Sequence, residues 1–423
     1  MTRRRVLFVT PCTFSSGETI TASHIAAELA FRDIDCWFAA SAQAGRILGS
    51  THGGRVVALG DSLADNQATW REAMTTLRPD AIVFADYPLL FFSSGAVPLA
   101  DAEWVADLGR FPGVLFTLDH LGYAQRRQIV YFGPPHLTFG AEVTADLPER
   151  MEILLPCPTH EPGAVPNRNG LPTRYWAAAE GHAEGEARKV RRRHLNGDDG
   201  ILVFHSTPSW ASRLAAQLRL PHYRFLPSIL QHCLSDLGYR VTIVSVNDGA
   251  MLAPSGTRDV RFVMLTPLDP AEYEALLSAA DLMLTDNAVS ASLGKAVCSL
   301  TPCALLRNTF ELTQLPGAVG DTVTALAIAM ENERPGAIFP FDVFPVWDES
   351  ALERLGFNYA SSYGQTFARL ELFGGETTRT AIAALLFDTA TRSTLRNSQR
   401  RYVSALTALP SAADAIALRI DGG

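Results

Sequence analysis

The sequence has few of the features that assign a chain to a specialised class. Its six cysteines are scattered over 423 residues without a CxxC pair, so their spacing fits no zinc template and predicts reduced thiols in a cytoplasmic protein. No apolar run approaches the roughly 18 residues of a membrane span. The basic and apolar start, MTRRRVLFVTPCTF, has only VLFV before Thr10 and Pro11, which is too short for a signal peptide and predicts a buried strand.

An excess of positive charge is also missing. The chain has 36 lysines and arginines against 44 aspartates and glutamates, a formal charge of −8, whereas a general nucleic-acid binder needs a basic face. The basic runs at 3–5 and 188–193 contain no aromatic residues, so each is interpreted as a solvated flank. We therefore expect neither nucleic acid nor a membrane among the partners.

Apolar residues are plentiful, at 47% of the chain, and the length suits about two domains with large cores. Apolar runs at 5–11, 35–41, 81–88 and 113–120 alternate with helical stretches such as 20–33. Apolar runs without polar alternation indicate strands that are buried on both faces. They predict a parallel sheet covered by helices.

This pattern occurs twice, which sets the expected domain boundaries. Residues 1–158 are predicted to form the first domain, and residues 159–199, rich in proline, glycine and charge, are predicted to form a linker. The alternation restarts in a second domain at 200–385. Helices at 386–423 are expected to end the chain, and a return of the last helix to the first domain is left open.

The strand ends of the second domain carry hydroxyl groups and small side chains. His205 to Ser209 follow the strand at 200–206, Thr266 to Leu268 follow the strand at 260–265, and TDNAVSAS at 285–292 leads into a helix. Ligands of doubly wound sheets bind at the carboxyl ends of strands, beside helix amino termini. Hydroxyls and backbone amides at such a place suit a pyrophosphate.

Three consecutive segments of the second domain resemble the GT-B glycosyltransferases. Ala279-Ala280-Asp281 matches an AAD segment at a strand start, the run 292–296 (SLGKA) takes the place of S-x-x-E-A, and Leu300-Thr301-Pro302 takes the place of a G-x-P turn. The resemblance implies an α/β fold with two Rossmann-like, doubly wound parallel-sheet domains facing across a cleft. The first domain then binds the acceptor and the second binds the nucleotide-sugar.

The resemblance also implies a set of donor-binding residues. Lys295 departs from the pattern, because many family members have a glutamate there that accepts hydrogen bonds from ribose hydroxyls, and a lysine can only donate. Either Lys295 reaches a phosphate or the nucleoside lies differently; a solvent-facing surface lysine is the structural alternative. The expected donor-binding residues are His205, Ser206, Thr207, Ser209, Thr266, Leu268, Asn287, Ser290, Ser292 and Lys295.

The first domain resembles the acceptor domain of the family through a helix end that reads AAELAFRD. The family's spacing places Glu18 where many inverting members have a histidine base, and a partly desolvated carboxylate can do that work. The rival candidates are His24 in the same helix and the Asp119-His120 pair after a strand. Asp86 ends a further strand towards the same expected cleft. The structural alternatives are a helix-terminus carboxylate for Glu18 and a packed or surface histidine for His24.

The leading hypothesis is a metal-independent glycosyltransferase that moves a sugar from a nucleotide-diphosphate sugar to a small-molecule acceptor in secondary-metabolite biosynthesis. No separate cofactor is expected, because helix dipoles, hydroxyls and Lys295 neutralise the leaving diphosphate. Two alternatives stay open: a nucleotide-sugar 2-epimerase or hydrolase of the same fold, and a non-catalytic helper protein. The expected partners are the nucleotide-sugar donor and the acceptor, and a homodimer is left open.

Overall fold

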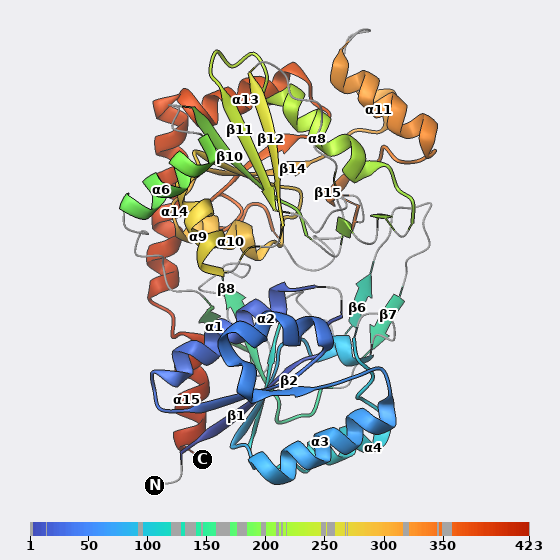
Figure 1. Cartoon of the computed structure of the whole chain (residues 1–423), viewed down its shortest axis with the longest axis vertical. Helices are drawn as coiled ribbons and strands as arrows, with labels where there is room; N and C mark the ends of the chain where they lie inside the picture. Colours follow the sequence, from blue (N-terminus) through green and yellow to red (C-terminus); the bar gives the residue numbers. More distant parts are fainter. Residues whose placement is uncertain are drawn as a thin grey trace. The chain divides into compact units, whose positions relative to one another are not determined.

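A computed structural model gives the fold of the chain, which divides into two compact units (Figure 1). Unit 1 contains Met1–Tyr131, Gly140–Ala177 and Ala405–Gly423, and unit 2 contains Phe132–Phe139 and Ala178–Ser404. The structure describes residues 3–13, 15–91, 96–119, 128–131, 141–144, 147–157, 170–175, 184–195, 200–208, 211–212, 215–216, 218–246, 251, 259–266, 268, 270–315, 321–344, 347–348 and 358–422.

The main sheet of unit 1 has seven strands within the described ranges, in the order β3-β2-β1-β4-β5-β8-β9. Each neighbouring pair is parallel. The chain starts in the middle of the sheet and moves outward first to one edge and then to the other, as doubly wound folds do. The strands are β1 (Arg5–Thr10), β2 (Asp35–Ala40), β3 (Val56–Ala58), β4 (Ala81–Phe84), β5 (Val114–Leu118), β8 (Glu152–Cys157) and β9 (Gly170–Arg174), with a separate antiparallel pair β6 (Gln128–Tyr131) and β7 (Ala141–Thr144).

Helices cover both faces of this sheet, with α3 and α4 on one face and α1, α2 and α15 on the other (Figure 1). α15 comes from the end of the chain and packs on α1 and β9. The helices are α1 (Gly17–Ala30), α2 (Ala42–His52), α3 (Leu63–Leu77), α4 (Ala102–Gly109) and α15 (Ala412–Gly422), with short 3₁₀ turns η1 (Gly53–Arg55) and η2 (Pro88–Phe91).

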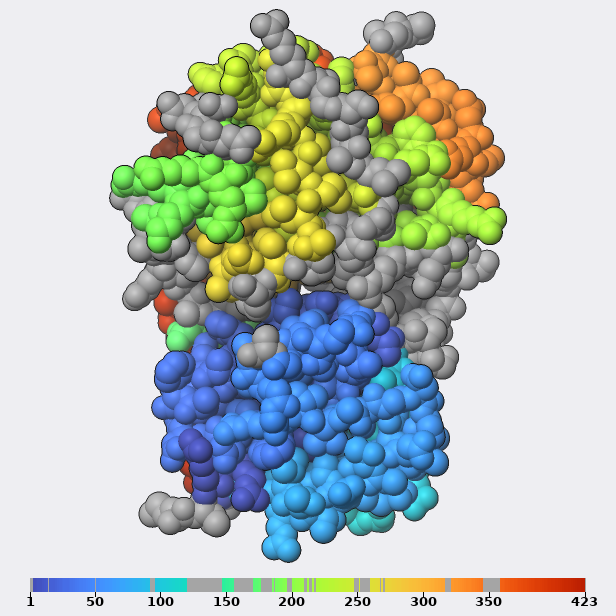
Figure 2. All heavy atoms as spheres, in the orientation of Figure 1, coloured from blue at the N-terminus to red at the C-terminus, as the bar shows by residue number. Residues whose placement is uncertain are grey.

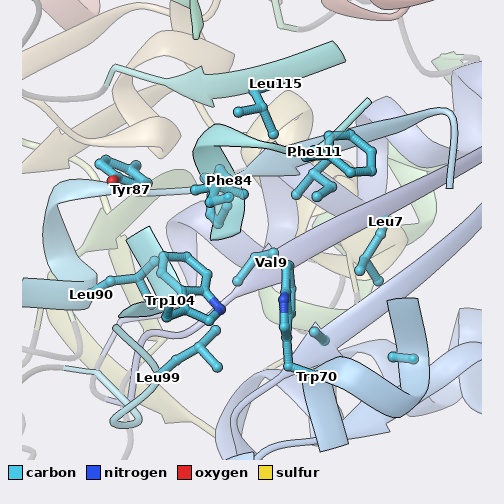
Figure 3. Close-up of a cluster of buried hydrophobic side chains, with 14 of the residues drawn as sticks. Leu7, Val9, Trp70, Phe84, Tyr87, Leu90, Leu99, Trp104, Phe111 and Leu115 are labelled. Atoms are coloured by element: carbon cyan, nitrogen blue, oxygen red, sulfur yellow. The ribbon is translucent and has the colours of Figure 1, made fainter. Parts of the chain in front are cut away.

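The alternation of side chains along β1 explains the two-sided core. Leu7 and Val9 point to the face where Trp70 of α3 and Trp104 of α4 meet Phe84 of β4 (Figure 3). The ring centroids of Trp104 lie 5.5 Å from Trp70 and 6.0 Å from Phe84, both in edge-on arrangements that aromatic pairs prefer. The intervening β1 side chains face the opposite way, which is why this strand reads as a continuous apolar run.

Unit 2 repeats the same plan with a six-stranded sheet in the order β12-β11-β10-β13-β14-β17 among the residues described. All five neighbouring pairs are parallel. The predicted fold class, two Rossmann-like α/β domains with doubly wound parallel sheets, is therefore confirmed. The strands are β10 (Ile201–Ser206), β11 (Val241–Val246), β12 (Val260–Leu265), β13 (Leu282–Thr285), β14 (Cys303–Arg307) and β17 (Ala368–Glu371), with a small antiparallel pair β15 (Phe341–Val343) and β16 (Trp347–Asp348).

The helices of unit 2 fall into two groups that pack among themselves. α6 packs on α9 and α9 on α10, whereas α8 packs on α11 and α13. α6 and α9 lie side by side on the face shown in Figure 2, in green and yellow. The helices are α6 (Glu184–Leu195), α8 (His222–Cys233), α9 (Pro270–Ala279), α10 (Ala291–Cys298), α11 (Thr322–Glu333), α13 (Glu376–Phe387) and α14 (Thr389–Thr407), with a 3₁₀ turn η3 (Leu312–Gln314).

A buried amide attaches α14 to unit 2. Gln399 Nε2 donates to the carbonyl oxygens of Thr301 (2.9 Å) and Thr366 (3.2 Å), and the residue is almost fully buried. These contacts join α14 to the backbone just before β14 and just before β17. Among the described helices, α14 included, none is both long and apolar enough to cross a membrane.

Candidate functional site

The start of α10 is built by a tight turn at the carboxyl end of β13. Thr285 Oγ1 accepts a hydrogen bond from Asn287 N (3.3 Å), and Asn287 Oδ1 accepts one from Val289 N (3.0 Å). Ser290 is the N-cap residue, and its Oγ accepts from Ser292 N at 3.1 Å. The side chains of Asn287 and Ser290, both predicted to bind the donor, therefore hold the turn that presents the helix amino terminus.

Three hydroxyl groups meet beside this helix start, and we call them the hydroxyl cluster: Ser206, Tyr273 and Ser292. The Tyr273 hydroxyl lies 2.8 Å from Ser206 Oγ and 2.5 Å from Ser292 Oγ, and Ser206 Oγ donates to Ser292 Oγ at 3.2 Å. Burial raises the pKa of Tyr273, so its hydroxyl keeps its proton. Rotating hydroxyls next to the positive end of a helix dipole suit a phosphate oxygen.

Sequence reasoning found two members of the hydroxyl cluster and missed Tyr273. The search covered strand ends, and Tyr273 lies inside α9, where its ring also packs edge-on against Phe204 at 5.1 Å. A tyrosine in a helix usually reads as core packing, so the sequence held no clear signal for it.

His205 is predicted to bind the donor, but the structure buries it completely within the sheet. The register of β10 and β11 sets His205 opposite Ser245, and His205 Nδ1 lies 3.0 Å from Ser245 Oγ. The other ring nitrogen, Nε2, lies 3.4 Å from Thr207 Oγ1. Burial lowers the pKa of His205 to about 3, so the imidazole is neutral and acts as a fixed hydrogen-bonding group.

A second buried centre, Asp286, follows β13 and joins the loop after β10 to α8. Thr207 Oγ1 donates to Asp286 Oδ1 at 3.2 Å, and the Tyr223 hydroxyl of α8 lies 3.0 Å from Asp286 Oδ2. Asp286 is fully buried, and burial raises its pKa to about 7. Sequence analysis assigned no role to Asp286 or Tyr223, although an acidic residue directly after an apolar strand was a signal for the former.

The remaining predicted donor residues lie in different surroundings. Lys295 Nζ forms an ion pair with Glu274 Oε1 of α9 at 2.5 Å. Thr266, after β12, is exposed, and Leu268 is partly buried. Ser209 lies outside the described residues. The structure thus brings Ser206, Thr207, Asn287, Ser290 and Ser292 together around the start of α10.

Two of the segments that carry the GT-B resemblance have structural roles. Asp281 Oδ2 accepts hydrogen bonds from Arg191 of α6 and from Leu202 N of β10, both at 2.8 Å. This ties the starts of two strands to a helix and engages one arginine of the basic run at 188–193. Leu300, in the place of the glycine of the G-x-P turn, has a φ of 56°, the left-handed region that favours glycine.

In unit 1, three carboxyl groups gather at the carboxyl edge of the sheet: Glu18, Asp86 and Asp119. Glu18 lies in the first turn of α1, and Asp86 and Asp119 follow β4 and β5. Burial, the charge of Glu18 and the charge of Asp119 raise the pKa of Asp86 well above its usual range, so Asp86 interacts with both of the other groups. Glu18 Oε2 is buried without a hydrogen-bond partner in the described structure.

The other two predicted catalytic residues are not part of this group in the described structure. His24 Nε2 lies 3.4 Å from Glu28 Oε1, one turn along α1, and its side chain is 36% exposed. His120 lies outside the described residues. No group of three or more histidine, cysteine, aspartate or glutamate side chains in the described ranges is arranged to hold a metal ion.

A family model described as "Family of unknown function (DUF6365)" matches residues 25–419. The chain belongs to this family. No curated protein matches the sequence.

Solved structures share the fold over the full length. The glycosyltransferase SnogD from Streptomyces nogalater is 14% identical with a TM-score of 0.52, over 100% of both chains. The spinosyn rhamnosyltransferase SpnG is 14% identical with a TM-score of 0.52, over 98% of this chain and 99% of that one. The spinosyn forosaminyltransferase SpnP is 11% identical with a TM-score of 0.53, over 100% and 99%. This family member therefore has the GT-B fold of these glycosyltransferases.

Proposed function

We propose that the protein is a glycosyltransferase that transfers a sugar from a nucleotide-diphosphate sugar to a small-molecule acceptor. The observation that carries the proposal is the hydroxyl cluster at the amino terminus of α10, on the carboxyl edge of a doubly wound sheet. Ligands of such sheets bind at this edge, and hydroxyls that now contact one another can turn to donate to a diphosphate as its charge grows.

The donor half of the proposal assigns the diphosphate to unit 2. Ser206 and Ser292 donate to its oxygens, and Tyr273 holds the two serines in place. The turn built by Asn287 and Ser290 aims the first backbone amides of α10 at the same anion. Lys295 contributes by its charge, although its Nζ is engaged by Glu274.

The acceptor half of the proposal makes Glu18 the base. Its buried Oε2 has no hydrogen-bond partner among the described residues, which leaves an acceptor for the proton of an incoming hydroxyl, amine or thiol. The raised pKa of Asp86 favours its protonated form, which reduces the repulsion that Glu18 experiences compared with three ionised carboxylates.

The proposed reaction is a displacement at the anomeric carbon of the donor sugar. The acceptor atom forms a bond to that carbon while the bond from the carbon to the diphosphate oxygen breaks, and the diphosphate leaves with the electron pair. Glu18 takes the proton of the acceptor. No redox partner is needed to balance this step.

A small-molecule acceptor from secondary metabolism is part of the proposal. Its support is that two proteins of similar structure are the spinosyn rhamnosyltransferase SpnG and the spinosyn forosaminyltransferase SpnP, and that SpnG forms a complex with the spinosyn aglycone. The chain's own residues support a nucleotide-diphosphate donor more directly than a particular acceptor, since the hydroxyl cluster suits the phosphate oxygens of the donor.

The test is a calorimetric titration with uridine, thymidine, guanosine, cytidine and adenosine diphosphates, followed by product analysis with the matching donor. We expect one diphosphate to bind preferentially and the sugar to appear on an acceptor. Release of nucleoside diphosphate without any acceptor would favour the hydrolase or epimerase alternative. Binding without turnover would favour the helper alternative, and no binding of any of the five would refute the donor site.

A further inference from the structure

The Tyr223 hydroxyl lies within hydrogen-bond distance of two oxygens but has one hydrogen to donate. The Tyr223 oxygen lies 2.8 Å from the carbonyl oxygen of Phe344 and 3.0 Å from Asp286 Oδ2. A tyrosine has one hydroxyl hydrogen, and a carbonyl oxygen can only accept. If Tyr223 donates to Phe344 O, the second contact is complete only when Asp286 Oδ2 carries a hydrogen and donates it to Tyr223.

The other carboxyl oxygen of Asp286, Oδ1, accepts a hydrogen bond and does not donate one. Thr207 Oγ1 donates to Asp286 Oδ1 at 3.2 Å, as expected for the carbonyl oxygen of a protonated carboxyl group. With its hydrogen used there, Thr207 accepts from His205 Nε2 at 3.4 Å. His205 Nδ1 then accepts from Ser245, 3.0 Å away, in preference to the weaker contact of Ser245 with the Met251 sulfur at 4.0 Å.

All donors and acceptors along this path are therefore matched when every member is neutral. The path, which we call the Asp286 chain, runs from Ser245 through His205, Thr207, Asp286 and Tyr223 to the backbone of Phe344. It crosses three neighbouring strands of the sheet and reaches α8 and the end of β15. An ionised Asp286 breaks the pattern, because Tyr223 must then divide one hydrogen between two acceptors.

The surroundings of Asp286 provide no countercharge in the described part of unit 2. The titratable groups that face it are Tyr223 from α8 and, through Thr207, His205 from β10; burial keeps both neutral. Asp342 of β15 interacts with Tyr359 instead, and Lys295 of α10 pairs with Glu274. A buried carboxylate without a cation is costly, so burial favours the protonated form.

We propose that Asp286 is a neutral carboxylic acid that keeps its proton and donates a hydrogen bond to Tyr223, and that the Asp286 chain positions Thr207 and the start of α10 for a bound diphosphate. The second half of this inference rests on the proposed function. Asp286 is thus a positioning residue: it precedes the turn that starts α10, and its backbone carbonyl oxygen accepts a hydrogen bond from Phe344 N at 3.1 Å.

The first experiment measures the proton directly and uses no nucleotide. Infrared spectra of the whole protein and of Asp286→Asn are compared from pH 5.5 to pH 9. We expect a protonated-carboxyl band in the wild-type protein that disappears as pH rises through neutrality and is missing in Asp286→Asn. The comparison removes the contribution of Asp86, which both proteins share. If the two proteins show the same carboxyl bands at every pH, the neutral-acid assignment is overturned.

The second experiment measures positioning, with inorganic pyrophosphate as a probe that needs no knowledge of the base. An asparagine reproduces the neutral acid, since its amide donates to Tyr223 and its oxygen accepts from Thr207. We expect Asp286→Asn to match the wild-type affinity at pH 6 and to bind about tenfold more tightly than wild type at pH 8.5, the value of about one or two hydrogen bonds. Comparing the proteins at the same pH cancels the ionisation of pyrophosphate.

Further variants and outcomes distinguish an error in the donor site from an error in the positioning role or in the neutral-acid assignment. We expect Asp286→Ala and Tyr223→Phe to weaken pyrophosphate binding at both pH values, with folding checked by circular dichroism. An infrared band together with no pyrophosphate binding by any variant would refute the donor site while supporting the neutral acid. Equal pH dependence of binding in wild type and Asp286→Asn would overturn the positioning role. Weaker binding by Asp286→Asn at pH 6 would indicate an ionised Asp286 and overturn the neutral-acid assignment.

Discussion

Lys295 Nζ and Glu274 Oε1 are 2.5 Å apart, so the one cation of α10 is paired with a carboxylate of α9. The lysine side chain is 14% exposed and the glutamate 39% exposed, which makes this a half-buried pair at the contact of two helices. Lys295, which takes the place where the resemblance implies a glutamate in many family members, is thus held by a glutamate from the neighbouring helix. Lys295 therefore either only stabilises the contact between α9 and α10 or also binds the diphosphate, and the two roles can be measured separately.

The first prediction is that Lys295 and Glu274 act as a unit in stability. We expect Lys295→Met and Glu274→Gln each to lower the free energy of unfolding by about 1 kcal/mol, and the double variant to lose little more than either single one. Denaturant titration measures this. Asp107→Asn, which breaks the well-exposed pair with Arg110, is the control and should have no effect. If only Lys295→Met weakens diphosphate binding, the lysine also reaches the phosphate.

The second prediction concerns the hydroxyl cluster. We expect Ser292→Ala and Tyr273→Phe each to weaken nucleoside diphosphate binding about tenfold, because each removes a hydroxyl that donates to or orients the anion. Calorimetry gives the affinities. The control is Ser398→Ala on α14, where the serine interacts with Arg401 at the surface. Unchanged affinity in both cluster variants would place the diphosphate elsewhere.

The third prediction distinguishes Glu18 from His24 as the base. We expect Glu18→Gln to lower kcat by about 10²- to 10⁴-fold with little change in KM for the donor, as the loss of a general base does. His24→Gln should stay close to wild type, because His24 contacts Glu28 rather than the carboxyl group of Asp86. Steady-state kinetics of both variants decide the matter, and the reverse ranking would make His24 the base.

The fourth prediction is the pH dependence of stability. The pKa of Asp286 is about 7 in the folded protein, whereas the ordinary pKa of an aspartate, which applies to the unfolded chain, is 3.8. The folded state therefore binds more protons between these values, and the free energy of unfolding falls as pH rises from about 4 to 7, then levels off. The total loss from this group is on the order of 4 kcal/mol. Denaturant titrations at several pH values should show a shallower fall in Asp286→Asn; the raised pKa of Asp86 acts with the same sign in both proteins.

The fifth prediction concerns the core of unit 1. Trp104 fills the space between Trp70 and Phe84 (Figure 3), and its buried indole nitrogen has no hydrogen-bond partner in the described structure. We expect Trp104→Ala to cost about 3–5 kcal/mol. Trp104→Phe should cost much less, because it keeps an aromatic ring and removes an unsatisfied polar group. Equal losses in the two variants, measured by denaturant titration, would contradict this expectation.

Much of the architecture could be predicted because buried parallel strands leave a strong local signal. The runs that became β1 and β10 are apolar on both faces, and that pattern requires helices on both sides of the sheet. The positions of Ser206 and Asn287 followed from the same reasoning, since strand ends can be read from where an apolar run stops. Interactions across the fold left no such signal: nothing local connects Gln399 to Thr301, which are 98 residues apart.

The sequence by itself thus determined which segments become strands and helices, and which polar residues stand at the carboxyl edges of the two sheets. Only the tertiary structure decided what those residues touch. It buried His205 and Asp286, which shifted their pKa values in opposite directions. It also brought Tyr273 to Ser292, Tyr223 to Asp286 and Glu274 to Lys295. The physical reason is that strand and helix patterns arise from neighbours along the chain, whereas desolvation and hydrogen-bond partners arise from the packing of segments that are distant in sequence.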